Sequence, residues 1–183
     1  SPAPAPAAFP QRLRARDLGG LNSPVQDAAG AAAGSRRAVL AAGLTATDTS
    51  RADIISVSGG REAVLGRLPG ALHDSAAVAI GGAVYLFGGG DGVRQLDQIL
   101  RIDTATGASR RVGSLPAPSS DQAGAALGDT AYIVGGFDGS AWLDTIVAWT
   151  PAGGAHVVAH LPSPLRYAAV TAVDGRIVIA GGT

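Results

Sequence analysis

The residues Tyr85-Leu86-Phe87-Gly88-Gly89 return as Tyr132-Ile133-Val134-Gly135-Gly136, 47 residues further along the chain. The surrounding positions also match, because Leu68-Pro69 corresponds to Leu115-Pro116 and Leu96-Asp97 corresponds to Leu143-Asp144. A third copy starts at Leu161-Pro162 and runs into Gly181-Gly182. The chain is therefore a repeat protein.

The period of the repeat is 46 to 47 residues, as the Leu-Pro pairs at 68, 115 and 161 show. One period before Leu68 lies Leu21, and Ala41-Ala42 takes the place of the glycine doublet 20 residues after it. A period of this length is typical of a four-stranded propeller blade or of a pair of helices. The local pattern within each unit decides between them.

Short apolar runs separated by turn residues predict strands. In the second unit we expect strands at 76–80, 84–87, 99–102 and 109–112, and in the third at 123–127, 130–134, 146–149 and 156–159. In the first unit we expect them near 30–33, 38–42, 54–57 and 63–65. No segment holds a helical period for three turns, and strands at roughly ten-residue spacing indicate an all-β fold.

These residues resemble the kelch repeat of β-propellers. The resemblance rests on the glycine doublets, on Tyr85 and Tyr132 before them, on the Asp-Gly loops at 91–92 and 138–139, and on the Leu-Pro between units. It covers 21–183 and implies one four-stranded blade per unit, whose first strand lines a central channel. The chain departs from the family pattern because its fourth strands lack the usual tryptophan, and its first unit lacks the doublet.

The resemblance divides the chain into six parts. We expect a Pro/Ala-rich linker at 1–10, a stray fourth strand at 11–20, blade 1 at 21–67, blade 2 at 68–114, blade 3 at 115–160, and the first two strands of blade 4 at 161–183. The fold class is then a kelch-type propeller of about three and a half four-stranded blades. Since propellers close with four to eight blades, the chain is either part of a longer propeller or one half of a ring closed by a homodimer.

Composition narrows the range of partners. The chain has 14 basic and 14 acidic residues, 4% aromatic residues and no Cys. A balanced charge and few aromatics give no electrostatic footprint or stacking platform for nucleic acid. The sequence shows no membrane span, and the Pro/Ala leader resembles the stalk that follows a bacterial export signal or lipid anchor. We therefore expect an extracytoplasmic location, with a cytoplasmic one as the alternative.

Candidate ligand-binding residues follow from the resemblance, because kelch proteins carry such groups on loops that lead into the first strand or leave the second. That position is occupied by Asp27, by His73 and Asp74, by Ser120 and Asp121, and by Arg166 and Tyr167. An Asp in three of four units suits a cation, an amine or sugar hydroxyls. A repeated Asp can equally be structural, by accepting backbone hydrogen bonds. Arg166 and Tyr167 break the pattern and are the better candidates.

Other motifs carry less information. His156 and His160 would lie about 13 Å apart on one strand face, which is too far apart to bind one metal ion. Since the chain also lacks Cys, the sequence predicts no metal site and no cofactor. His73 and Asp74 are adjacent, so in a regular strand they would point to opposite faces. Asp53, Asp97 and Asp144, before the third strands, are expected to be structural. Trp142 lies on a loop and suits packing between blades or stacking on a ligand.

We expect a non-catalytic binding module that recognises a protein or a glycan through loops at one end of the channel. Among kelch enzymes, copper radical oxidases need a cysteine, which the chain lacks. An enzyme of the sialic-acid mutarotase type remains an alternative. A structural or sensor repeat of a longer envelope protein is the third possibility.

Overall fold

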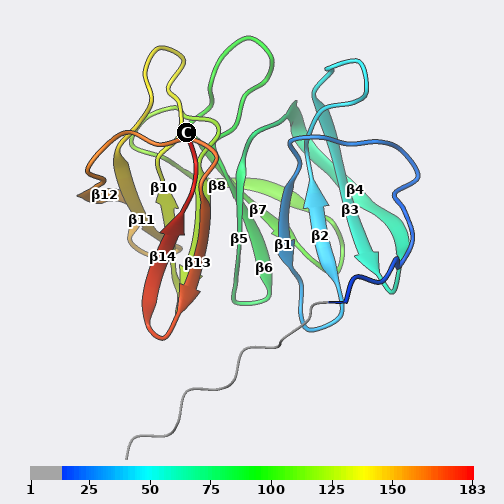
Figure 1. Cartoon of the computed structure of the whole chain (residues 1–183). Coiled ribbons are helices and arrows are strands. Elements are labelled where there is room, and N and C mark those ends of the chain that lie inside the picture. The colour runs from blue at the N-terminus through cyan, green and yellow to red at the C-terminus, as the bar shows by residue number, and fades with distance from the viewer. Residues whose placement is uncertain (1–13) are drawn as a thin grey trace, which may run out of the picture.

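The computed structural model describes residues 14–183, which form fourteen strands in four sheets and no helix (Figure 1). Blade 1 contains β1 (Ala29–Ala32), β2 (Ala38–Ala41), β3 (Arg51–Ser58) and β4 (Arg61–Leu72). Blade 2 contains β5 (Ala76–Ile80), β6 (Ala83–Phe87), β7 (Gln98–Asp103) and β8 (Ser109–Ser114). Blade 3 contains β9 (Ala123–Leu127), β10 (Thr130–Val134), β11 (Thr145–Thr150) and β12 (Gly154–His160). Blade 4 has β13 (Ala169–Val173) and β14 (Arg176–Ala180).

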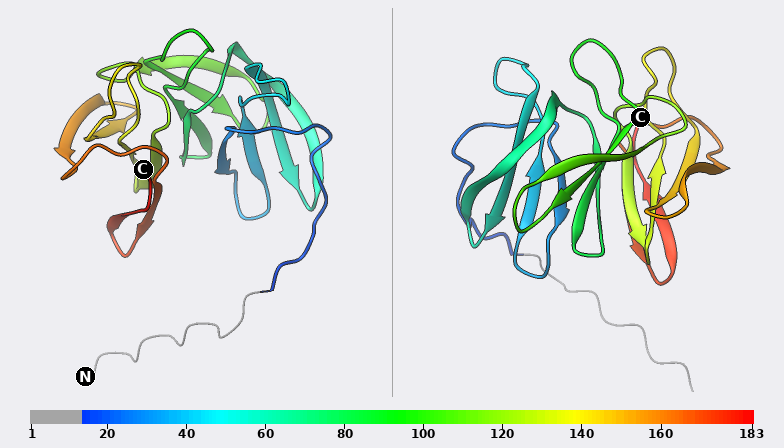
Figure 2. Two further views of the ribbon diagram at one scale, coloured as in Figure 1. Left: turned by 45° about the horizontal axis from the view of Figure 1, so that its top comes forward. Right: turned by 180° about the vertical axis from the view of Figure 1, so that it is seen from behind.

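Each sheet is antiparallel, with its strands in chain order. Successive blades stand side by side along an arc, as the left view of Figure 2 shows. The all-β fold and the three and a half blades predicted from the sequence are confirmed. No helix within the described residues is long and apolar enough to span a membrane.

The innermost strands are rich in small residues. β1 reads AGAA, β5 reads AAVAI and β9 reads AGAAL, and each contacts the innermost strand of the next blade. Strands that converge on an axis leave little room for side chains, so alanine and glycine allow this close approach. The high alanine content therefore reflects the centre of a propeller rather than helices.

Tight hairpins join the first two strands of blades 2 and 3. Gly81 and Gly82 have φ of 57° and 78°, which is the conformation of a type I′ turn. This turn fixes the pairing of Ile80 with Ala83 and of Ala76 with Phe87. The glycine pair therefore determines which residues of β5 and β6 face each neighbouring blade.

Apolar side chains fill the spaces between blades. Between blades 1 and 2 lie Val39, Ala41, Ile54, Val84, Leu86, Leu100 and Ile102. Between blades 2 and 3 lie Val78, Tyr85, Phe87, Ile99, Ile133, Val147 and Trp149. Trp149 is 2% exposed, and its ring centroid lies 4.7 Å from that of Tyr85 and 5.4 Å from that of Phe87. It is the largest fully buried side chain of the described residues.

Two expectations about strands were wrong. Of the stray strand expected at 11–20, residues 11–13 lie outside the described residues and 14–20 are not in a strand. The Asp17 carboxylate accepts the Gly19 N–H at 2.8 Å, and Gly19 has φ of 123°, so the chain turns there. It then passes against the turn at Gly59-Gly60, which joins β3 to β4, and forms no strand pair with the sheet.

The fourth strand of blade 1 was expected at 63–65 but extends from Arg61 to Leu72. It therefore continues through Leu68-Pro69, which we expected to begin the next blade. Proline is tolerated because β4 is the outermost strand of its sheet, where an N–H is not needed for pairing on the open side.

Candidate functional site

One residue in every blade adopts a left-handed backbone just before the first strand. These residues are Asp27, Asp74, Asp121 and Tyr167, with φ of 53°, 54°, 61° and 55°. The amide N–H of each of the last three donates to the carbonyl of the preceding member, at 3.0 to 3.1 Å. A continuous line of backbone hydrogen bonds thus joins the four blades at this end.

The backbone explains much of the recurrence of Asp. Among non-glycine residues, Asp and Asn enter the left-handed region most readily, whereas a bulky side chain there costs roughly 1–2 kcal/mol. Asp27, Asp74 and Asp121 therefore meet a requirement of the scaffold. Tyr167 adopts the same left-handed φ, although tyrosine does so less readily than Asp. Backbone strain at a single residue is often retained where its side chain has a function.

The three carboxylates and Tyr167 line one open hollow of about 220 Å³, together with Ser75. The lining residues Asp27, Asp74, Asp121 and Tyr167 come shortly before the first strands. The loops between second and third strands lie at the same end of the blades (Figure 1). The sequence-based candidates Asp27, Asp74, Asp121 and Tyr167 are thus brought together by the fold. Within residues 14–183, no three His, Asp or Glu side chains are arranged to hold a metal ion.

Asp74 is the most perturbed acid of the hollow. Burial raises its pKa from 3.8 to about 7, and the negative charges of Asp121 and Asp27 act in the same direction. Arg166 opposes the rise but does not cancel it. A carboxyl group that exchanges its proton near neutral pH can act as a hydrogen-bond donor or as an acceptor.

Arg166 joins blade 4 to blade 3. One of its terminal nitrogens donates to Asp121 Oδ2, and the same nitrogen lies 2.9 Å from the Tyr167 hydroxyl. The Asp121 side chain is 3% exposed and that of Arg166 is 22% exposed, so the pair is largely withdrawn from water. The Arg166 Nε is buried and has no hydrogen-bond partner among the described residues.

Three aromatic rings surround the Arg166 guanidinium. Its central carbon lies 4.7 Å from the ring centroid of Phe137, 4.8 Å from that of Tyr167 and 5.9 Å from that of Trp142. Such contacts attract a cation to the face of each ring. Trp142 and Tyr167 are nevertheless 47% and 56% exposed, so their outer faces are open to a partner.

His73 lies closer to Asp74 than the alternation of a strand would allow. Its Nε2 is 3.7 Å from Asp74 Oδ2, while its Nδ1 is 2.9 Å from the Ser50 hydroxyl. The expectation that the two side chains would point apart was wrong, because the left-handed φ of Asp74 breaks the alternation. Ser120 is buried, and its hydroxyl donates to Asp121 at 3.1 Å.

The remaining recurrent carboxylates have structural partners. Asp91 and Asp138 each accept backbone N–H groups two and three residues ahead, and these hydrogen bonds lower the pKa of both. Asp53, which lies in β3 and not before it, pairs with Arg67. Asp97 and Asp144, directly before β7 and β11, pair with Arg111 and His160. In blades 1, 2 and 3 these pairs join the third strand, or the residue before it, to the fourth strand.

Phe137 was not identified from the sequence. It follows the glycine doublet of blade 3 and pairs by isolated bridges with Ser120 and Trp142. The equivalent residue of blade 2 is Gly90, so a departure from the repeat was the available signal. Trp142 was expected between blades or on a ligand, and it lies exposed beside Arg166 of the following blade.

The chain is similar to known proteins in one repeat and in its fold. Residues 71–116 match the family model of the Kelch motif. A solved structure described as "Structure of YjhT" superposes with a TM-score of 0.75 at 14% sequence identity. The match covers 88% of this chain and 60% of that one, so this chain spans less than two thirds of its length. No curated protein shows significant sequence similarity to the chain.

Proposed function

Because the chain carries a kelch repeat in the fold of a kelch-type β-propeller, we propose that it is a non-catalytic binding module. It recognises a protein or a glycan with the loop end of the channel. One observation carries the proposal: Trp142 and Tyr167, whose rings both contact the partly buried Arg166, expose large aromatic surface. Aromatic and arginine side chains are enriched where proteins bind partners.

The chemistry of the hollow limits what can bind there. The charge of Arg166 is already balanced by Asp121, whereas no ion pair joins Asp27 to any cation of the described residues. The carboxylates of the hollow therefore outnumber its cations, which favours hydroxyl groups or a positively charged group as the ligand of a binding module. Trp142 and Tyr167 supply flat apolar faces for a sugar ring or for an apolar side chain.

The test is binding by the whole chain to a glycan array and to immobilised candidate proteins, repeated with Trp142→Ala and Tyr167→Ala. We expect each substitution to weaken binding at least tenfold. Val64→Ala is the matched control, because Val64 is also an exposed apolar side chain but lies on the outer strand β4. Equal binding by all variants would reject the site.

A second candidate is a sugar-active enzyme of the sialic-acid mutarotase type. It is favoured by Asp74, whose pKa of about 7 suits proton transfer near neutral pH, and by the nearby His73. Exchange between the anomers of N-acetylneuraminate, followed by NMR, tests it. The enzyme predicts exchange that Asp74→Asn abolishes, and a binding module or a structural repeat predicts none.

We also propose an extracytoplasmic location, supported by the Pro/Ala-rich sequence at 1–10 and the absence of Cys. Cell fractionation of the natural gene product tests it.

The partner that completes the ring is either further blades of a longer chain or a second copy of this one.

A further inference from the structure

Three polar side chains meet where blade 1 contacts blade 2, at the loop end of both blades. The Ser50 hydroxyl lies 2.9 Å from His73 Nδ1, and His73 Nε2 lies 3.7 Å from Asp74 Oδ2. Ser50 directly precedes β3, while His73 and Asp74 lie between β4 and β5. A hydroxyl, an imidazole and a carboxylate in this order match a nucleophile, its general base and the group that orients the base.

The position of Asp74 fixes which imidazole nitrogen acts as the base. An ionised carboxylate can only accept a hydrogen bond, so the imidazole N–H is held on Nε2, on the side of Asp74. His73 Nδ1 is then free to accept the Ser50 proton. The separation of 3.7 Å is longer than a hydrogen bond, and contacts of this kind often shorten when a substrate binds.

The repeat itself does not require a serine beside a histidine. Isolated bridges at the loop end place Gln95 and Trp142 of the next two blades at the position of Ser50. They also place Ser120 at the position of His73. The backbone therefore forms the same junction with other side chains, so the pair is better explained by its chemistry than by the scaffold.

Two glycines of the neighbouring loop leave room around the pair. A Cβ added at Gly90 would lie 3.3 Å from His73 Nε2, whereas the residue at this bridge position in blade 3 is Phe137. A Cβ added at Gly92 would lie 3.8 Å from the Ser50 hydroxyl oxygen. The Gly92 N–H has no acceptor among residues 14–183, so it is available to donate to an oxyanion formed beside Ser50.

A substrate can reach Ser50 from the loop end. Ser50 lines an open hollow of about 530 Å³ together with the short side chains of Thr45 and Thr47, which gives room for a small acyl group. This access does not depend on what precedes blade 1. Gln95 and Trp142 occupy the same position in blades that have a neighbour on each side, and both remain partly or largely exposed.

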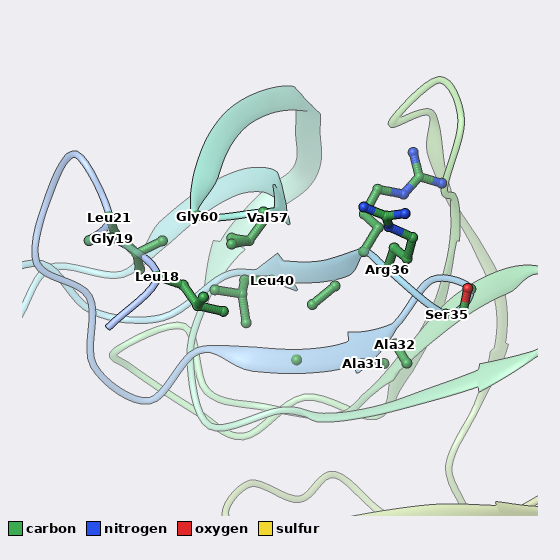
Figure 3. Close-up of a pocket in the computed structure, with 16 residues that line it drawn as sticks. Leu18, Gly19, Leu21, Ala31, Ala32, Ser35, Arg36, Leu40, Val57 and Gly60 are labelled. Atoms are coloured by element: carbon green, nitrogen blue, oxygen red, sulfur yellow. The ribbon is translucent and has the colours of Figure 1, made fainter. Parts of the chain in front are cut away.

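A wider hollow of about 650 Å³ lies elsewhere on blade 1, where Leu18, Leu40 and Val57 line it (Figure 3). Val39 and Ala41 face blade 2, so the alternating Leu40 is on the opposite side of the sheet. Each later blade packs this side against the blade before it. The wider hollow is therefore a packing face and takes no part in the chemistry of Ser50.

We propose that Ser50, His73 and Asp74 hydrolyse esters of short-chain carboxylic acids through an acyl group held on Ser50. The Ser50 oxygen bonds to the ester carbonyl carbon while its proton passes to His73 Nδ1. The bond from that carbon to the alcohol oxygen then breaks, and the alcohol takes the proton from His73. A water oxygen next bonds to the acyl carbon, a water proton passes through His73 back to the Ser50 oxygen, and the carboxylic acid leaves.

This reaction goes beyond the proposed binding function and does not rest on it. The aromatic surface of Trp142 and Tyr167 lies at the junction of blades 3 and 4, and it binds a partner without chemistry. Asp74 belongs to both sites, because it also lines the hollow with Tyr167, whereas Ser50 does not line that hollow. Substitutions of Ser50 therefore test the hydrolysis alone.

Diisopropyl fluorophosphate tests the nucleophile without assuming a substrate. The Ser50 oxygen bonds to phosphorus, fluoride leaves and the proton passes to His73. The whole chain is treated at about pH 8, above the raised pKa of Asp74, and its peptides are analysed by mass spectrometry. Ser50 should be labelled at least about a hundredfold faster than Ser58, whose hydroxyl donates to the Arg36 carbonyl at the other end of β3. Equal labelling of the two serines overturns the proposal.

Hydrolysis of p-nitrophenyl acetate tests turnover. Ser50→Ala and His73→Gln should each lower kcat/KM by about a hundredfold or more, and Ser58→Ala should leave it unchanged. Asp74→Asn should lower kcat at least about tenfold with little change in KM, as expected of a positioning residue in a folded protein. Circular dichroism checks the fold of each variant. A wild-type rate that Ser50→Ala leaves unchanged overturns the proposal.

Discussion

Arg166 reaches from blade 4 to the buried carboxylate of Asp121 in blade 3, and no other cation of the described residues pairs with that carboxylate. The contact also places the guanidinium against Phe137, which leaves the same loop end of blade 3. A single side chain thus connects the last interface between blades to the candidate site. Changes at Arg166 should therefore affect both stability and binding.

Arg166→Ala should lower the free energy of unfolding by about 2–4 kcal/mol, because it leaves the Asp121 carboxylate buried without its partner. Urea unfolding measures the change. Arg94→Ala is the control, since the Arg94 side chain is 78% exposed and its contact with Asp91 is a surface pair. The control should cost less than about 1 kcal/mol. Equal losses in the two variants would contradict the importance of the buried pair.

The raised pKa of Asp74 predicts a pH dependence of stability. Between its ordinary pKa and about 7 the folded state binds more protons than the unfolded state. The stabilising contribution of the protonated carboxyl is complete below the ordinary pKa, and it is lost as the pH rises through about 7. Thermal unfolding should therefore show Tm decreasing from about pH 4 to about pH 8.

Asp74→Asn should flatten this slope and raise Tm at pH 8, because the amide cannot ionise. We expect the free energy of unfolding to rise by about 1 kcal/mol at pH 8. The gain is limited because water in the open hollow screens part of the repulsion between the carboxylates. Asp129→Asn, in the exposed turn between β9 and β10, is the control and should leave the slope as in the wild type. If the slope survives in Asp74→Asn, another group causes it.

The glycine doublet should tolerate no side chain at its second position. Gly136 has φ of 117°, and a Cβ there would lie 2.7 Å from the Ser120 carbonyl oxygen and 3.2 Å from Gln122 Cβ. Gly136→Ala should therefore lower the free energy of unfolding by more than about 2 kcal/mol. Gly128 also has a positive φ but nothing within 4 Å, so Gly128→Ala should cost only about 1 kcal/mol. Chemical denaturation of the pair separates crowding from backbone strain.

The two tryptophans should respond differently to a soluble quencher. Trp149 is 2% exposed between blades 2 and 3, and Trp142 is 47% exposed at the loop end. Acrylamide should quench a single-tryptophan Trp149→Phe variant strongly and a Trp142→Phe variant weakly. A ligand that covers the site should protect only the first variant. Similar quenching of both would be inconsistent with the buried position of Trp149.

The sequence determined the strands best where glycine turns bound them. β5, β9 and β10 begin and end at the predicted residues, because Gly81-Gly82 and Gly128 leave only one possible hairpin. β4 was predicted nine residues too short, since its length depends on pairing with β3 across two register shifts. Residues 14–20 do not form the predicted strand, because alternation of apolar and polar residues does not provide a neighbouring strand to pair with.

The candidate site was predictable in position but not in chemistry. The offset within the repeat identified Asp27, Asp74, Asp121 and Tyr167, which the fold brings to one hollow. The pairing of Arg166 with Asp121 and its enclosure by aromatic rings depend on side chains that reach between blades. No pattern within a single repeat contains that information.

The line of left-handed residues has one more consequence. Its hydrogen bonds use only backbone atoms, so the path of the chain is the same whether the position holds Asp or Tyr. The side chain at this position can therefore differ between blades while the backbone stays the same, at a cost of about 1–2 kcal/mol where it is bulky. A nearly symmetric scaffold in this way holds an asymmetric lining, and new specificities can arise there by single substitutions.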